Sequence, residues 1–213
     1  MSARNRLWEI AVSLRKHSGF VQSAFKSSIP VETIKLHWNH VLSTRNGRCV
    51  TIDISSMCLN TELTDRYEHM RMHLRDIPQE IIDQHQLKDK VASDGYVYIE
   101  IRRAIYGLRQ SGKLANNQLK ENLAMHGYYP SKHTPGLFFH KTRPISFSLV
   151  VDDFGVCFQK QEDAEHLVNS LKNHCPIKMD WLGSRCVGVD LEWNGNNRTL
   201  KTSMKNCIER APM

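Results

Sequence analysis

Two adjacent aspartates stand between two short apolar runs in residues 145–158. Runs of β-branched and aromatic residues of this length are typical of β-strands, in which alternate side chains share one face. The pattern therefore predicts a β-hairpin with Asp152 and Asp153 at its tip. Two carboxylates side by side repel each other, and a hard cation such as Mg²⁺ between them would relieve that repulsion. We interpret the tip as part of a metal site that needs a third carboxylate.

A candidate third carboxylate follows another strand-like segment. In residues 49–54, apolar β-branched residues alternate with Thr51 and Asp53, as they do in a half-buried strand. Asp53 stands near the end of this segment. A lone aspartate there is better explained as the N-cap of a following helix or as a solvent-exposed residue at a sheet edge. Its combination with the aspartate pair makes it a candidate metal ligand.

The remaining patterns predict helices that alternate with strands. Apolar residues recur at helical spacing in residues 31–42, 113–126 and 163–174, and short helices are expected in residues 55–63 and 77–82. Strand-like alternation is found in residues 69–74 and 96–101, and a two-residue turn at Asn194-Gly195 predicts a closing hairpin over residues 186–204. We expect an α+β fold, with a mostly antiparallel sheet of about four strands and helices packed on one face.

Composition places the chain among ordinary globular proteins, since 40% of its 213 residues are hydrophobic and 24% are charged. No apolar run approaches the ~20 residues of a membrane span, so a membrane partner is not expected. The formal charge of +7 favours a polyanionic partner such as nucleic acid. None of the six cysteines is spaced C-x-x-C, which favours free thiols in a reducing intracellular compartment, cytoplasmic or nuclear. His69 and His73 fall on the polar side of a predicted strand, so zinc is not expected.

Residues 1–30 differ from the rest of the chain because they are basic and contain a single acid, Glu9. Apolar residues recur there at helical spacing. Such a segment is compatible with a mitochondrial targeting peptide, with an ordinary surface helix or with a poorly ordered end. We take residues 31–204 as one domain and residues 205–213 as a short tail.

Four motifs in this order resemble the palm of a reverse transcriptase, most closely that of the copia-type retrotransposon enzymes. The resemblance covers roughly residues 31–204. The motifs are Thr51-Ile52-Asp53-Ile54 with Leu59-Asn60-Thr61, then Ala104-Ile105-Tyr106-Gly107-Leu108-Arg109-Gln110, then Val150-Val151-Asp152-Asp153, and finally Asp180-Trp181-Leu182-Gly183 with the hairpin after it. The resemblance implies a palm-like domain with part of the fingers.

The activity implied by the resemblance is RNA-directed DNA polymerisation. A deoxynucleotide is transferred from its triphosphate to a primer 3′-hydroxyl, and two Mg²⁺ ions, or Mn²⁺, clamp the attacking and leaving oxygens. By resemblance, Asp53 and Asp152 bridge the metals and Asp153 has a supporting role. The implied partners are an RNA or DNA template with its primer and deoxynucleoside triphosphates. The sequence does not indicate an oligomeric state.

The resemblance also implies contacts with the nucleotide and the nucleic acid. Gly107 and Gln110 would lie against the incoming nucleotide and the template. Where the family carries Phe or Tyr beneath the sugar, this chain has Cys58, and the smaller side chain predicts weak discrimination against ribonucleotides. The candidates for phosphate contacts are Arg102, Arg103, Arg109 and Lys113, although a solvated basic surface explains these four residues equally well.

Two other hypotheses remain. The first is a decayed, catalytically inactive fragment of a retroelement that at most binds nucleic acid. The family's triphosphate-gripping fingers strands are not recognisable in residues 1–30, nor are thumb, connection and RNase H parts recognisable after the last hairpin, so a fragment is expected. The second is a protein kinase, because Asp153-Phe154-Gly155 spells that family's metal-binding triplet. A kinase also needs a glycine-rich phosphate loop and a His-Arg-Asp loop upstream, and this sequence has neither.

Overall fold

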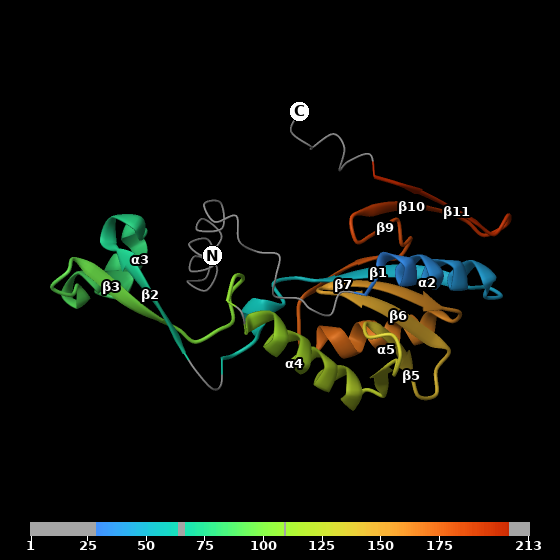
Figure 1. Ribbon diagram of the computed structural model, residues 1–213, viewed down its shortest axis with the longest axis horizontal. Coiled ribbons are helices and arrows are strands. Elements are labelled where there is room, and N and C mark those ends of the chain that lie inside the picture. Colours follow the sequence, from blue (N-terminus) through green and yellow to red (C-terminus); the bar gives the residue numbers. More distant parts are fainter. Residues whose placement is uncertain (1–28, 64–66, 109, 205–213) are drawn as a thin grey trace. The chain divides into compact units, whose positions relative to one another are not determined.

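The computed structural model describes residues 29–63, 67–108 and 110–204, shown in Figure 1. The chain divides into two compact units, one of which contains residues 58–115 and the other residues 29–57 together with 116–204. Each unit has an apolar core of its own. The predicted N-terminal helix, the tail and Arg109 lie outside the described residues.

The larger unit is built on a six-stranded antiparallel sheet. Its strands are β1 (Arg48–Ile54), β4 (Tyr128–Pro130), β5 (Leu137–His140), β6 (Ile145–Val150), β7 (Asp153–Phe158) and β8 (Ile177–Asp180), in the order β4-β5-β6-β7-β1-β8. Every neighbouring pair runs antiparallel. The α+β class with an antiparallel sheet is therefore confirmed. The sheet is larger than the four strands expected, because β4, β5 and β8 are too short to show a clear alternation.

One face of this sheet carries its large apolar side chains. Phe147, Phe154 and Val156 are fully buried there, and the ring centroids of Phe147 and Phe154 lie 5.1 Å apart. Helix α5 (Gln161–Lys172) covers this face, which the hydrogen bond between His166 Nδ1 and the hydroxyl of Tyr128 confirms at 2.9 Å. Because burying large apolar side chains is the main stabilising term in folding, this face forms the principal core.

The opposite face carries small and polar side chains and is covered by helix α2 (Val31–Ser43), which Figure 1 shows on the other side of the sheet from α5. His37 of α2 reaches Ser146 of β6, with 3.0 Å between Nε2 and Oγ. Trp38 packs with Cys186 and Leu191 of the neighbouring sheet. Helices therefore cover both faces and not one, because the small residues of this face leave room for a helix to approach closely.

A three-stranded sheet also belongs to the larger unit. It consists of β9 (Arg185–Cys186), β10 (Val189–Asn194) and β11 (Thr199–Ser203), in the order β11-β10-β9. The predicted closing hairpin is thus present as β10 and β11. The predicted two-residue turn at Asn194-Gly195 is wrong, because residues 195–198 connect the strands. The side chain of Asn194 accepts a hydrogen bond from the backbone N–H of Asn197 at 3.1 Å and fixes this longer loop.

The smaller unit contains an antiparallel two-stranded ribbon. Its elements are η1 (Cys58–Asn60), β2 (Glu68–His73), η2 (Leu74–Asp76), α3 (Gln79–Gln84), η3 (Leu87–Lys90) and β3 (Tyr96–Ile101), and helix α4 (Ser111–Met125) runs from this unit into the larger one. Met72 and Val97 on one face of the ribbon pack against Ile81 of α3. His69 and His73 lie on the other face, as predicted.

Among the helices of the described residues, none has both the length and the apolar character needed to cross a bilayer.

Candidate functional site

The β6–β7 hairpin has a two-residue turn that places the aspartates at its end. Val150 pairs with Asp153, so Val151 and Asp152 form the turn and Asp153 begins β7. Val151 has φ of 60°, a left-handed conformation that is rare for a β-branched residue. The hairpin predicted for residues 145–158 is confirmed. The strained turn at its tip is of the kind that concentrates at functional sites.

Asp53 lies directly opposite Asp153 on the neighbouring strands β1 and β7. The backbone N–H of Ile54 donates to the carbonyl oxygen of Asp152 at 3.0 Å. Because hydrogen-bonded and non-hydrogen-bonded pairs alternate along an antiparallel ladder, Asp53 and Asp153 form a non-hydrogen-bonded pair, in which the Cα atoms are about 4.5 Å apart. The hairpin and β1 therefore bring two carboxylates onto the same face of the sheet, with Asp152 in the adjoining turn.

The three carboxylates influence one another electrostatically. Partial burial, together with the charges of Asp152 and Asp53, raises the pKa of Asp153 to about 6, while Arg185 opposes the shift. A site that disfavours its own ionised form in this way favours a bound cation. Carboxylate oxygens are the ligands that Mg²⁺ and Mn²⁺ prefer, so the donor set fits such an ion.

The three carboxylates are suitable ligands for Mg²⁺ or Mn²⁺, but they are not arranged in a preformed coordination geometry. Across residues 29–63, 67–108 and 110–204, no three His, Cys, Asp or Glu side chains are grouped as metal ligands. Binding an ion at the three aspartates therefore requires their carboxylates to rotate toward a common point. Such a rotation is available to half-buried side chains at the end of a hairpin.

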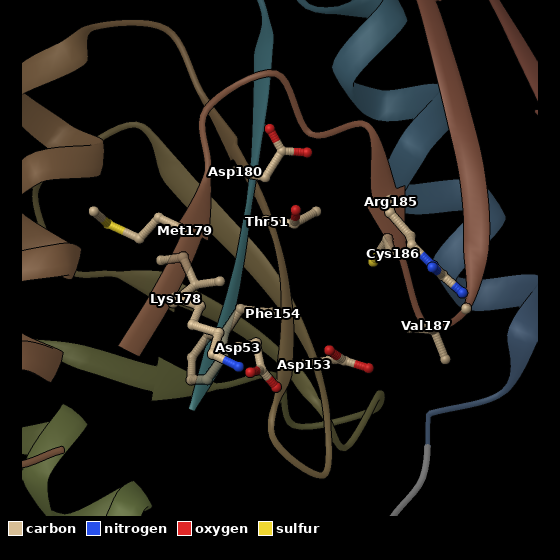
Figure 2. A pocket seen from close by; sticks show the side chains of 12 residues that line it. Thr51, Asp53, Asp153, Phe154, Lys178, Met179, Asp180, Arg185, Cys186 and Val187 are labelled. Atoms are coloured by element: carbon tan, nitrogen blue, oxygen red, sulfur yellow. The ribbon is translucent and has the colours of Figure 1, made fainter. Parts of the chain in front are cut away.

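A cavity of about 390 Å³ opens beside the carboxylate pair, and Figure 2 shows the side chains that line it. Lys178 stands opposite Asp53 on β8, and Arg185 of β9 is close enough to Asp153 to lower its pKa. In Figure 2 the two carboxylates lie between these two cationic side chains. The cavity thus offers two adjacent carboxylates for a cation, with a cationic side chain on either side of them for an anionic ligand.

Neither cationic residue of this cavity was predicted from the sequence. The alternation in residues 177–180 could have placed Lys178 and Asp180 on one face of a strand, but the segment is only four residues long. Arg185 gives no such signal, since it begins a two-residue strand. It forms a long ion pair with Asp190, at 3.8 Å between Nε and Oδ1, and its side chain is half exposed.

Asp180 of the fourth motif has a structural role in the turn that follows β8. Its carboxylate accepts hydrogen bonds from the backbone N–H of Leu182 at 2.9 Å and from the backbone N–H and hydroxyl of Ser184 at 2.6 Å. These bonds fix the loop that leads from β8 to Arg185.

The residues assigned to nucleotide contacts belong to the smaller unit, whereas the aspartates belong to the larger one. Cys58 is buried at the start of η1. Gly107 has φ of 104°, and a Cβ built there would meet no atom within 4 Å. The amide of Gln110 donates to Glu68 Oε1 at 3.1 Å. The backbone at Gly107 is therefore accessible, while the side chain of Gln110 already has a partner on β2.

Two of the predicted phosphate-binding residues are engaged locally. Arg102 donates to Glu100 Oε1 at 2.7 Å. Arg103 donates to the carbonyl oxygen of Leu59 at 3.4 Å and lies 3.7 Å from a carboxylate oxygen of Glu62. Lys113 is exposed in the first turn of α4. These contacts leave the guanidinium groups at the surface and do not assemble them into one cluster.

No family model matches this sequence. Among solved structures, the chain is similar to telomerase from Candida tropicalis truncated from the C-terminal domain, with 14% identity, a TM-score of 0.42, and coverage of 94% of this chain and 44% of that one. It is also similar to telomerase from Candida albicans in complex with a TWJ fragment of telomeric RNA, with 11% identity, a TM-score of 0.46, and coverage of 89% and 36%. The chain thus spans less than half of these telomerase chains. Similarity at this level assigns no role to individual residues.

Proposed function

We propose that the larger unit is the palm of an RNA-directed DNA polymerase of the copia retrotransposon type. The observation that carries this proposal is the opposed pair Asp53 and Asp153 with Asp152 in the adjoining turn. Carboxylates from two separate strands that meet on one face are what a two-metal phosphoryl transfer requires. The motif order in the sequence supports the same assignment.

Each residue of the site has a proposed part in the reaction. Asp53 and Asp152 would hold the metal ions, and Asp153 would support them from the first position of β7. Bound Mg²⁺ or Mn²⁺ would supply the positive charge that activates the primer hydroxyl and neutralises the phosphate oxygens. Lys178 and Arg185, which flank the pair, carry the charge needed to bind phosphate oxygens of the triphosphate or the primer.

The proposed partners are a template with its primer and deoxynucleoside triphosphates, and the proposed location is the cytoplasm or nucleus. Gly107 would lie against the incoming nucleotide, where its accessible backbone permits a close approach. Gln110 would have to leave Glu68 to do the same. Arg102, Arg103 and Lys113 are proposed to contact phosphates at the surface of the smaller unit.

Primer extension tests this function. The full chain is incubated with a primed RNA template, deoxynucleotides and Mg²⁺ or Mn²⁺, and incorporation is measured for the wild type and for Asp53→Asn, Asp152→Asn and Asp89→Asn. We expect the first two variants to lose at least about 100-fold in rate, as when a charge-stabilising group is removed from an active site. Asp89→Asn is the control, because Asp89 is exposed in η3. Incorporation that survives Asp152→Asn would contradict the assignment.

Metal binding tests the aspartate site independently of nucleotide incorporation. Mn²⁺ that binds the native state raises the melting temperature in a concentration-dependent way, by the equivalent of about 2.7 kcal/mol at a hundred times Kd. We expect this rise for the wild type and its loss in Asp53→Asn. Equal shifts in both proteins would exclude the aspartate site.

A second candidate is nucleic-acid binding without catalysis, as expected of a decayed element. The net charge of +7 favours it. Two results together would support this alternative over the polymerase. The chain would bind a primed template without incorporating nucleotides, and Mn²⁺ would not raise its melting temperature.

A further inference from the structure

The β2–β3 ribbon of the smaller unit has two faces of opposite character. One face packs its apolar side chains against α3 and η3. The other face follows from the strand register, which pairs His69 with Glu100, Arg71 with Tyr98 and His73 with Tyr96. Tyr98 is 54% exposed on this second face. The ribbon therefore presents rings and cations to the solvent and keeps its aliphatic side chains inside.

The rings of this face are held in place by their neighbours. The guanidinium carbon of Arg71 lies 3.8 Å from the ring centroid of Tyr96, a close cation–π contact. The ring of His73 meets Tyr96 edge-on with 5.4 Å between centroids. The hydroxyl of Tyr98 donates to Asp94 Oδ2 at 2.8 Å, which fixes the direction of the exposed ring. A preoriented ring loses little conformational entropy when a flat ligand stacks on it.

The same arrangement extends to the start of the ribbon. Tyr67 is 45% exposed, and the guanidinium carbon of Arg102 lies 5.6 Å from its ring centroid. The two acids near these rings are already engaged, because Asp94 accepts from Tyr98 and Glu100 accepts from Arg102. Of the two acids only Glu100 is paired with a cation, while the hydrogen bond from Tyr98 lowers the pKa of Asp94 and keeps it ionised.

We propose that this face of the ribbon is a stacking platform for the bases of a single-stranded nucleic acid. Exposed aromatic side chains on a sheet face, with arginines beside them, are the means by which several protein modules bind single strands. The rings that are open to a base are those of Tyr98 and Tyr67, since Arg71 already covers one face of the Tyr96 ring. Interface cores are also enriched in Tyr and Arg, and the net charge of +7 is what favours a polyanionic strand over a protein partner.

The platform would add a binding surface for the template of the proposed polymerase. Only the identification of the bound strand as the template rests on the proposed function. The evidence for the platform lies wholly in the smaller unit. Few phosphates are contacted in this scheme, because only Arg71 and Arg102 are permanent cations on the face. The affinity should therefore depend weakly on salt, with a slope of log K against log salt of about −1.4 for two phosphate contacts on a single strand.

Fluorescence anisotropy with the full chain tests the platform. The probes are 5′-labelled twelve-nucleotide oligo(U) and oligo(dT), and the variants are Tyr98→Ala, Tyr98→Phe and Tyr129→Ala. Tyr129 is the matched control, because it is 45% exposed, against 54% for Tyr98, and lies on β4 of the larger unit. We expect Tyr98→Ala to raise Kd about 10-fold, as for the loss of one stacked base. Tyr98→Phe should keep most of the affinity, and Tyr129→Ala should leave it unchanged.

The outcomes separate this platform from the catalytic site. Three results would overturn the proposal. Tyr98→Ala could bind with wild-type affinity, or Tyr98→Ala and Tyr129→Ala could lose affinity equally. The wild type could also fail to bind either probe. Asp53→Asn should bind the oligonucleotides normally while it loses primer extension, so failure of one hypothesis leaves the other standing.

Discussion

Asp53 and Asp153 face each other across β1 and β7 with no backbone hydrogen bonds between them. Like charges opposed in this way destabilise a sheet. The structure shows the cost in the pKa of Asp153, which partial burial and the two neighbouring aspartates raise to about 6. A fold that retains this pair gives up stability at a position where a neutral residue would serve the sheet better.

The first prediction concerns that cost. Because Asp153 takes up its proton more readily in the folded state, stability should fall as the pH rises from about 4 to 6 and stay low above it. Asp153→Asn should therefore be more stable than the wild type at pH 7.5 by about 1–2 kcal/mol without metal, after allowance for solvent screening. Urea unfolding at pH 7.5 and pH 4 measures the difference, which should shrink at pH 4. A variant less stable than the wild type at pH 7.5 would contradict the electrostatic account.

A second prediction concerns His37, which is 6% exposed between α2 and the sheet. Burial, together with the charge of His40, lowers the pKa of His37 to about 4. Because the unfolded state binds the proton more readily, stability should be lost as the pH falls from 6.5 to 4, by about 3 kcal/mol in total. His37→Gln should flatten this dependence in urea titrations. His69→Gln, on the exposed face of β2, is the control and should leave the dependence unchanged.

Gly155 provides a third prediction. A Cβ at this position would lie 2.9 Å from Ser148 Oγ and 3.1 Å from Cys186 Sγ, both of which are buried. Gly155→Ala should therefore destabilise the larger unit by about 1–3 kcal/mol, as overpacking does elsewhere. Gly195→Ala is the matched control, since its Cβ would meet nothing within 4 Å. Urea unfolding compares the two variants, and equal stabilities would show that the small-residue face has more room than the structure indicates.

The fourth prediction follows from Cys58, if the chain extends primers. Reverse transcriptases, which the sequence resembles, carry an aromatic residue where this chain has the smaller Cys58, so we expect a preference for deoxynucleotides over ribonucleotides below about 100-fold, in the range that a modest steric difference gives. Single-nucleotide incorporation with each triphosphate measures the ratio of kcat/KM values. Strict selection of deoxynucleotides would show that another side chain excludes the 2′-hydroxyl.

The sequence predicted the elements with strong periodicity. The strand expected at residues 96–101 is found as β3 (Tyr96–Ile101), and the helix expected at residues 31–42 is found as α2 (Val31–Ser43). In contrast, β4, β5, β8 and β9 have two to four residues each and were not predicted. Their existence depends on pairing with partners distant in the chain, which local patterns do not encode.

The role of the three aspartates as site residues stays a prediction, and their geometry was not predicted. The three aspartates were identified from their position after apolar runs, but the register that sets Asp53 opposite Asp153 arises from pairing across a hundred residues of chain. The same holds for Lys178 and Arg185, which enter the cavity only because β8 and β9 lie beside β1 and β7. The copia-type resemblance and the metal ions stay predictions.

The strict alternation along β1 has a consequence for how this gene segment can change. Val50 and Ile52 face the apolar core, while Thr51 and Asp53 face the cavity. Removal of one codon between them would turn Asp53 into the core and bring an apolar side chain to the cavity, since the side-chain period of a strand is two. Point substitutions in β1 would lower stability by amounts that depend on the residue replaced. A single in-frame deletion would disrupt the core packing of β1 and remove Asp53 from the cavity at the same time.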